Sequence, residues 1–439
     1  MHSEPKVLLK QAIQRCLPIL QSLVGRFSTP CLVWKNTGEG QWNGAWVSHP
    51  DLAQIFAAAD KEICHAGAAF GESFLEHHKE FNGMVGCPRF GWFNFGAYRT
   101  YIVRSSLGHL WDRFESFDLG EDLVDGLVKE VEAFVDAPLV RLQFRARLLN
   151  FRSHVASIDL PEGLRIRRLT ESEFSSMHGG TMYNRHSVRN NTLGLHEFCI
   201  EGVTEEPKMH GDPKEEEPPA SDQVREKLDR SMLCLRTFKA GKVGYDQVDY
   251  FPVAFCPLIF GSRFYGDLYV PLGTYEIKAH EIAPLVYHAK LVFGVSDDAM
   301  AMACSRLADA ELRTRPQDCI VDAVIGMEAL LLAGMDDRRS ELSFRFALNY
   351  SMLHPTDERK KAYRVARDLY GLRSKVAHGS SIDGEKLKIA DQKVSLDGAS
   401  TMATESLRFI MMFFLAKKGS PHKNHDFWQR AYFGLPEEL

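Results

Sequence analysis

The apolar residues in the first part of the chain change between helical and strand-like spacing. Residues 6–27 repeat apolar positions at helical intervals and predict an amphipathic helix, in which Pro18 can introduce a kink. Residues 28–48 mix Trp, Gly and Val and predict short strands and turns. Residues 49–81 and 121–153 return to helical spacing, so this part of the chain is expected to contain both kinds of element.

Strand-like spacing continues on both sides of a polar segment. Residues 164–170 alternate apolar and basic side chains and predict a strand with one solvated face. Residues 204–222 are rich in Pro, Glu and Lys and predict a flexible insertion or linker. The segments 231–251 and 262–277 carry β-branched and aromatic residues punctuated by Gly and Pro, which favours strands. We therefore expect residues 1–290 to form an α+β region.

The last part of the chain predicts helices that follow one another. Strand signals fade there, and helix-capping or helix-ending residues recur between apolar segments. These boundary residues are Thr314, Pro316, Gly334, Ser340, Thr356, Gly379 and Gly419. Successive helices with short links predict that residues 296–439 form a helical bundle, in which only the polar link at 380–399 is longer.

The composition is that of a globular protein without a general excess of positive charge. The 439 residues are 45% hydrophobic and 25% charged, with a formal net charge of −5, and this length favours two or three domains. Residues 301–439 carry 21 Lys and Arg against 19 Asp and Glu, whereas the remainder carries 32 against 39. A polyanion is therefore expected to bind only locally, and the C-terminal part is the better candidate.

Cysteine usage and hydropathy indicate a cytoplasmic protein. The nine cysteines are scattered and form no C-x-x-C pair, which predicts reduced thiols. The N-terminal residues lack the apolar segment of a secretory signal, and no stretch approaches about eighteen uncharged apolar residues. Neither secretion nor a membrane span is expected.

The segment with the most chemical content is YGLRSKVAHGS at 370–380. It places Arg373 and His378 in an R-x4-H spacing late in a basic helix. His transfers a proton readily near neutral pH, and Arg holds phosphate oxygens through two hydrogen bonds. The pair could cleave RNA without a metal or other cofactor, because the attacking 2′-hydroxyl already belongs to the substrate.

Helix geometry adds a condition on how the pair can act. Five residues along a helix separate two side chains by roughly 140° around the axis and about 7.5 Å along it. One helix therefore presents Arg373 and His378 poorly to a single phosphate. Two copies that meet across a two-fold axis could combine both pairs in one cleft, so the spacing favours an active homodimer.

Neighbouring segments extend the motif into a family resemblance. IVDAVIGMEALLL at 320–332, ELSFRFALNY at 341–350 and DLYGLRSKVAHG at 368–379 resemble, in this order, the Apea-type branch of the HEPN family. The resemblance covers roughly residues 296–420. It implies a helical bundle that dimerises through the motif face. It also implies metal-independent RNase activity that leaves a cyclic phosphate, as in many toxin–antitoxin, abortive-infection and antiviral members of the family.

The resemblance also implies roles for single residues. The family's motif Arg and His fall on Arg373 and His378, which would be the catalytic pair. Ser374 stands where many other branches have Asn, His or Asp, which a serine replaces only in part. Glu328 falls on a recurrent acid that would orient Arg373, and Tyr370 would support the site mainly by packing.

Simpler interpretations of the motif residues remain open. His378 directly precedes Gly379 and could be a C-capping histidine that interacts with the last helix carbonyls. Arg373 could form a purely structural ion pair with Glu328 or Asp368, and such a pair is compatible with phosphate binding.

A basic stripe precedes the motif. Lys360, Arg364 and Arg367 fall at i, i+4 and i+7 of the same predicted helix, and Lys375 lies beside the motif Arg. We consider these four residues candidates for contact with the RNA backbone. The alternative is a solvated helix face without a ligand.

Two other patterns predict no functional site. A metal is not expected at the cluster of potential ligands in 64–80, because its spacing fits no known ligand pattern. The cluster consists of Cys64, His65, Glu76, His77, His78 and Glu80. The string AGKVG at 240–244 lacks the spacing of a phosphate-binding loop and predicts a hairpin turn.

The sequence thus predicts an α+β region at 1–290 followed by a HEPN-type bundle at 296–439. The predicted function is a defence-type (antiphage) or toxin-like endoribonuclease that acts on RNA as a cytoplasmic homodimer. The N-terminal region would sense a phage-derived or cellular trigger, or restrain the nuclease. The alternatives are a non-catalytic HEPN module that binds RNA or a protein partner, and a ligand-sensing regulatory protein whose bundle serves dimerisation.

Overall fold

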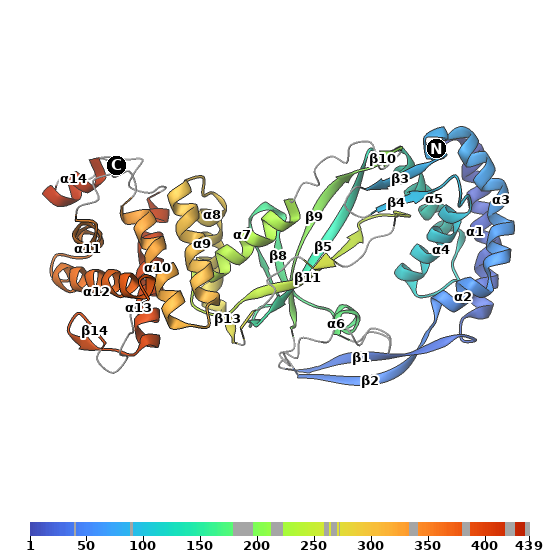
Figure 1. Cartoon of the computed structure of the whole chain (residues 1–439). Helices are drawn as coiled ribbons and strands as arrows, with labels where there is room; N and C mark the ends of the chain where they lie inside the picture. Colours follow the sequence, from blue (N-terminus) through green and yellow to red (C-terminus); the bar gives the residue numbers. More distant parts are fainter. Residues whose placement is uncertain are drawn as a thin grey trace. The chain divides into compact units, whose positions relative to one another are not determined.

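The computed structural model divides into two compact units, each assembled from several stretches of chain (Figure 1). Unit 1 comprises Met1–Arg147, Gly163–Arg225 and Asp246–Tyr265, and unit 2 comprises Leu148–Glu162, Glu226–Tyr245 and Gly266–Leu439. The residues that the structure describes are 1–38, 41–87, 91–178, 196–211, 223–258, 263–264, 270–271, 273–332, 341–379, 387–417 and 426–434. Unit 2 therefore includes stretches of chain that precede residue 290.

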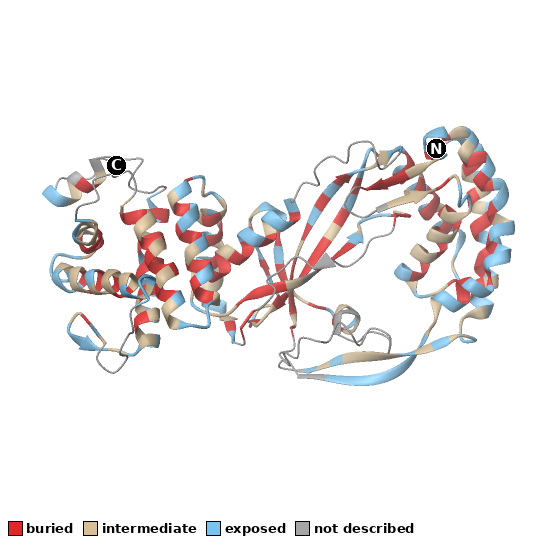
Figure 2. Ribbon diagram, viewed as in Figure 1, coloured by how far each residue is buried: buried red, intermediate tan, exposed pale blue. Residues whose placement is uncertain are grey.

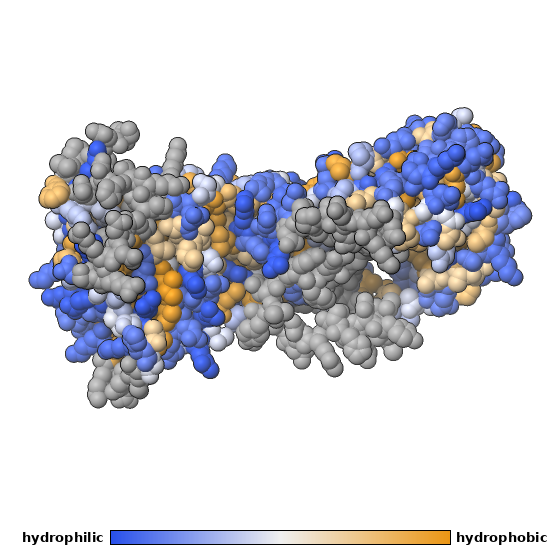
Figure 3. Space-filling view, turned by 45° about the horizontal axis from the view of Figure 1, so that its top comes forward, coloured by the Kyte–Doolittle hydropathy of each residue, from blue (hydrophilic) through white to orange (hydrophobic). Residues whose placement is uncertain are grey.

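Amphipathic helices form one part of unit 1. They are α1 (Ser3–Leu23), α2 (Leu52–Ala58), α3 (Asp60–His77), the 3-10 helix η1 (Lys79–Phe81), α4 (Tyr101–Phe114), α5 (Glu121–Asp136) and α6 (Glu171–His178). Helix α1 buries Leu9, Ile13 and Leu20 at helical spacing, and it packs against α3, α4 and α5. Figure 2 shows buried and exposed positions on opposite sides of the helices in this region, and Figure 3 shows mostly hydrophilic residues on their visible outer face.

An antiparallel sheet forms the other part of unit 1. The strands that lie in this unit follow the order β12-β11-β5-β9-β8. They are β5 (Leu139–Leu149), β8 (Arg165–Arg168), β9 (Phe198–Pro207), β11 (Gly244–Pro252) and β12 (Arg263–Phe264). Along β5, Leu142 and Phe144 are fully buried, whereas Arg145 pairs on the opposite face with Glu173 of α6 at 2.7 Å. This alternation gives the sheet one apolar and one charged face.

Shorter strand pairs complete unit 1. They are the hairpin β1 (Ser28–Gly38) and β2 (Gln41–Pro50), and the small sheet of β3 (Met84–Cys87), β4 (Gly91–Asn94) and β10 (Met209–His210). Helix α6 contacts β1, and the Trp34 backbone N–H donates to Ser175 Oγ at 2.8 Å. Gly44 lies opposite Trp34, where a Cβ atom would come within 3.2 Å of the indole.

Unit 2 is mainly helical. Its elements are β6 (Phe151–Ser153), β7 (Ser157–Asp159), the 3-10 turn η2 (Pro161–Gly163), α7 (Gln223–Phe238), β13 (Tyr275–Ile277), the 3-10 helix η5 (Ala279–Glu281), α8 (Ile282–Phe293), α9 (Asp298–Leu312), α10 (Pro316–Leu331), α11 (Leu342–Met352), α12 (Arg359–Ala377), β14 (Lys388–Ile389), β15 (Gln392–Lys393), α13 (Leu396–Ala416) and α14 (Asp426–Phe433). Helix α10 packs against α9, α12 and α13 and buries Ile320, Met327 and Leu330. It is the central helix of the bundle.

A buried ion pair ties α7 to the bundle. Arg408 of α13 pairs with Glu311 of α9, and both side chains are less than 10% exposed. Arg408 also donates to the backbone carbonyls of Arg236 and Thr237, at the end of α7. These carbonyls would otherwise lack partners at the helix end, so the arginine side chain acts as a cap supplied by another helix.

The structure corrects two expectations about periodic segments. The predicted helix at 121–153 ends at Asp136, and Leu139–Leu149 forms strand β5, because its burial alternates with period two. The first residues of the predicted strand segment 231–251 belong instead to α7, since Leu228, Met232 and Leu235 are buried at helical spacing.

Two further expectations concern polar segments. Residues 204–207 of the predicted linker 204–222 belong to β9. Thr204 lies opposite Leu142 of β5 in the antiparallel pair of strands. The rest of that linker from 212 lies outside the described residues. The predicted hairpin turn at 240–244 instead links helix α7 to strand β11.

The coarse prediction of an α+β region followed by a helical part is confirmed. The predicted helix at 6–27 corresponds to α1. The proposed helix boundaries at Gly334, Ser340 and Gly419 lie outside the described residues. Among the helices that the structure describes, none combines the length and apolar character needed to cross a lipid bilayer.

Candidate functional site

Helix α12 positions the R-x4-H motif. It buries Val365, Ala366 and Leu369 against the bundle, and it packs against α11 and α10. Gly379 follows it with φ at +69°, a conformation that favours glycine and ends the helix. The motif therefore lies at the C-terminal end of a firmly packed helix.

Arg373 is held in a cluster of polar side chains. Its Nη2 atom lies 3.2 Å from Glu328 Oε2 of α10, and the two side chains are 29% and 20% exposed. The Tyr370 hydroxyl also hydrogen-bonds to Glu328, and its ring packs 5.1 Å from that of Phe346. Of the two pairings that the sequence left open for Arg373, the structure contains the one with Glu328.

The cluster retains unused hydrogen-bonding capacity. The Arg373 Nε atom is buried and has no hydrogen-bond partner among the described residues. Burial raises the pKa of Glu328, although the nearby Arg373 charge and the Tyr370 hydrogen bond oppose this rise. Burial and the Glu328 charge raise the pKa of Tyr370. Because this N–H is buried, an anion could bond to it only after the side chains around Arg373 have moved.

His378 lies at the end of α12 in a different environment. Its backbone N–H donates to the Ser374 carbonyl at 3.0 Å, and its side chain is exposed. No hydrogen bond to the imidazole comes from the residues that the structure describes. Ser374 is half-buried one turn earlier. The imidazole is thus accessible to a substrate.

One copy of the chain does not direct the two motif side chains toward one point. Arg373 faces α10, whereas His378 lies roughly 140° around the α12 axis, on the exposed side. Lys360, Arg364 and Lys375 lie within about 60° of His378 on this side. We call this exposed side, with Arg367 included, the basic face of α12.

Acidic neighbours reduce the charge of the basic face. Arg364 pairs with Asp391 at 2.6 Å, and Arg367 pairs with Asp368 at 2.9 Å. Lys360 and Lys375 are exposed. Two of the four predicted RNA contacts therefore already have a carboxylate partner, and no part of the sequence pattern pointed to Asp391.

The potential metal ligands of residues 64–80 do not form one site. Cys64 lies 3.8 Å from Thr100, His77 bonds to the Ser73 carbonyl, and His78 lies 3.3 Å from Glu80. The described residues contain no group of three His, Cys, Asp or Glu side chains suited to hold a metal ion.

The known proteins offer no guide to this site. Neither family models nor curated proteins nor solved structures match the chain. The functional argument therefore rests on the residues themselves.

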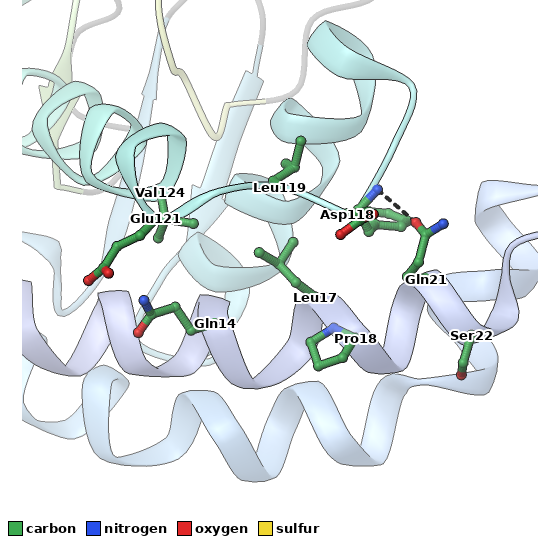
Figure 4. Close-up of a pocket in the computed structure, with 10 residues that line it drawn as sticks. Gln14, Leu17, Pro18, Gln21, Ser22, Asp118, Leu119, Glu121 and Val124 are labelled. Atoms are coloured by element: carbon green, nitrogen blue, oxygen red, sulfur yellow. Dashed lines mark hydrogen bonds between the residues drawn. The ribbon is translucent and has the colours of Figure 1, made fainter.

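A separate pocket of about 510 Å³ lies in unit 1 and was not anticipated from the sequence. Figure 4 shows it between α1 and the segment that leads into α5, with Leu17 directed toward Leu119. Pro18 lines it and has no N–H to donate to the Gln14 carbonyl. The proline inside a predicted helix was the one available signal, but it indicates a kink and not a ligand.

Proposed function

We propose that unit 2 is a metal-independent endoribonuclease of HEPN type, in which Arg373 and His378 act on RNA. The observation that carries the proposal is the contrast between the two motif residues. Arg373 is paired with Glu328, which also bonds to the Tyr370 hydroxyl, whereas His378 is exposed at the helix end. A fixed cation and an accessible proton carrier are the two groups that RNA cleavage by the 2′-hydroxyl requires.

The reaction balances without an added co-reactant. The 2′-oxygen forms a bond to the adjacent phosphorus, and the bond from phosphorus to the 5′-oxygen breaks. His378 would accept the proton of the attacking 2′-hydroxyl, and a histidine would return a proton to the leaving 5′-oxygen, so that no net proton is gained or lost. Arg373 would stabilise the charge on the phosphorane oxygens. The products would carry a 2′,3′-cyclic phosphate and a 5′-hydroxyl.

A second copy of the chain is part of the proposal. Because Arg373 and His378 diverge by roughly 140° within one helix, a competent cleft would combine residues of two copies across a two-fold axis. Unit 1 would then regulate the nuclease by responding to a phage-derived or cellular trigger. In this role the protein would be a defence effector or a toxin.

Cleavage of RNA by the purified chain in excess EDTA tests the activity. His378→Ala and Arg373→Ala should each remove most cleavage, and Arg373→Lys should restore little, because a point charge does not reproduce a bidentate fork. His280→Ala and Arg315→Ala are matched controls, since both residues are exposed in the same unit. Wild-type rates in His378→Ala would refute the catalytic assignment.

The divergence of the motif residues also favours a non-catalytic alternative. If the pair never meets, the basic face of α12 could bind RNA or a partner without cutting it. Binding of RNA without cleavage, equal in wild type and His378→Ala, would support this second function. Dependence of cleavage on Mg²⁺ would instead indicate metal-assisted hydrolysis.

A further inference from the structure

A hairpin of unit 2 places an acid on the basic face of α12. The hairpin β14–β15 has Ala390 and Asp391 at its tip. The Arg364 guanidinium donates to Asp391 Oδ2 at 2.6 Å, and the Ala390 N–H donates to Asp368 Oδ2 at 2.9 Å. Arg364 lies on the same side of the helix as His378, within about 40° around the axis. Asp391 is therefore paired with a basic residue on the same helix face as His378.

The hairpin is firmly attached, and its tip is strained. Ile389 is fully buried and anchors β14 to the bundle. Ala390 and Asp391 have φ angles of +50° and +67°, in the left-handed region that favours glycine; alanine is disfavoured there, whereas aspartate adopts this conformation more readily. Hairpins with this geometry commonly use Asn-Gly at the tip. Here an unfavourable turn directs a carboxylate at Arg364.

The contact has the chemistry of a phosphate contact. Carboxylates and phosphates both accept hydrogen bonds from a guanidinium group, often through two parallel bonds. The Arg364 and Asp391 side chains are 42% and 78% exposed, so the pair is solvent-accessible and can exchange partners. A nucleic-acid backbone on the basic face would meet Asp391 as a competing anion.

We propose that Asp391 is an internal competitor for the nucleic-acid backbone and limits its binding to the basic face of α12. The proposal rests on the proposed function, since it assigns this face to the substrate. When a phosphate replaces Asp391 on Arg364, the strand gains a cation contact, and the hairpin tip loses one of its two contacts. The ligand class is a single-stranded nucleic acid whose phosphates follow the helix.

Fluorescence anisotropy with the full chain and a labelled oligothymidylate DNA tests binding apart from cleavage, because the DNA lacks the 2′-hydroxyl. Asp391→Asn should bind about two- to fivefold more tightly at low salt, which is the range expected for one exposed ion pair. Its binding should also depend more steeply on salt, by about 0.7 in the logarithmic slope, because Arg364 becomes an additional phosphate contact.

Two controls separate competition from a general charge effect. Asp122→Asn makes the same change in net charge on an exposed residue of unit 1, and it should leave binding unchanged. In an Arg364→Ala background, Asp391→Asn should give no further gain, because the competed cation is absent. A gain that persists in that background would overturn the proposal.

The remaining outcomes are also decisive. Unchanged affinity in Asp391→Asn, with a lower midpoint of thermal unfolding, would show a purely structural contact and overturn the proposal. A tighter Asp391→Asn variant that cuts no RNA would support the competitor and refute the nuclease. If the wild type cuts RNA, but wild type and Asp391→Asn bind the DNA with equal affinity, the nuclease is supported and the competitor is refuted.

Discussion

The buried histidine His288 makes a quantitative prediction about acid stability. It lies in α8 and is 1% exposed. Its Nε2 atom lies 2.8 Å from Thr237 Oγ1, and its Nδ1 atom lies 3.2 Å from Met412 Sδ. Burial lowers the pKa of His288 from 6.5 to about 4; the Arg408 charge adds to this, and a hydrogen bond to the Cys234 backbone opposes it. The native imidazole is therefore neutral at pH 7.

The direction of the pH effect follows from proton binding. The unfolded chain binds a proton at His288 below about pH 6.5, whereas the folded chain resists it down to about pH 4. Stability from this residue is thus complete above pH 6.5 and declines as the pH falls toward 4. Between pH 7.5 and 5.0 the loss is about 2 kcal/mol, at 1.36 kcal/mol for each unit of pKa.

The perturbation that isolates His288 is His288→Gln, because a glutamine amide can still donate toward Thr237 but does not titrate. The free energy of unfolding of wild type and variant would be measured by urea denaturation at pH 7.5 and 5.0. The free energy of unfolding of wild type minus that of His288→Gln should be about 2 kcal/mol smaller at pH 5.0 than at pH 7.5. Carboxylates elsewhere titrate equally in both proteins, so they cancel in this comparison.

His280→Gln, at an exposed position, supplies the control for replacing a histidine by glutamine. If the stability difference between wild type and His288→Gln stayed constant within about 0.5 kcal/mol over this pH range, the reasoning from burial would be wrong. A difference that grew at low pH would mean that the folded protein stabilises the charged imidazole.

Other predictions concern the ion pairs and the assembly. Arg408→Ala should lower the free energy of unfolding by about 3–5 kcal/mol in urea denaturation, because Glu311 would remain as a buried unpaired charge; a loss below about 1 kcal/mol would contradict this. Glu328→Gln should reduce RNA cleavage about tenfold, since it loosens Arg373 but keeps a hydrogen-bonding group for Tyr370; an unchanged rate would exclude an orienting role. In mixtures of wild type with His378→Ala under free exchange, activity should fall as the square of the wild-type fraction, whereas a linear fall would mean that each copy acts alone.

Elements with a long regular period could be predicted from the sequence, and segments interpreted in isolation could not. Helix α7 was missed because its periodicity begins at Val224, just after residues assigned to a linker, so only its second half entered the prediction. Strand β5 contains Leu, Arg and Ala, which are good helix formers, and its alternating burial decided the structure. Tertiary packing outweighed local propensity in β5, whereas the local propensity of α7 agreed with its structure and only the division of the segment hid it.

The candidate site shows the same division. The R-x4-H spacing could be recognised directly in the sequence, and Glu328 was indicated by the family resemblance; the structure places Glu328 beside Arg373. The contact of Asp391 with Arg364 could not, because it joins residues 27 positions apart through a turn of two non-glycine residues in left-handed conformation. Sequence patterns carry little information about such a turn.

The cap that Arg408 provides for α7 has a consequence for synthesis on the ribosome. The Thr237 carbonyl accepts a hydrogen bond from Arg408, which is translated 171 residues later. At about 5–20 residues per second, this interval lasts roughly 10–35 seconds. During this time the carbonyls at the end of α7 lack the cap that Arg408 supplies, so the last turn of the helix is free to fray. A chain that terminated before Arg408 would keep the end of α7 without this cap, which should show as faster amide hydrogen exchange in the last turn of the helix.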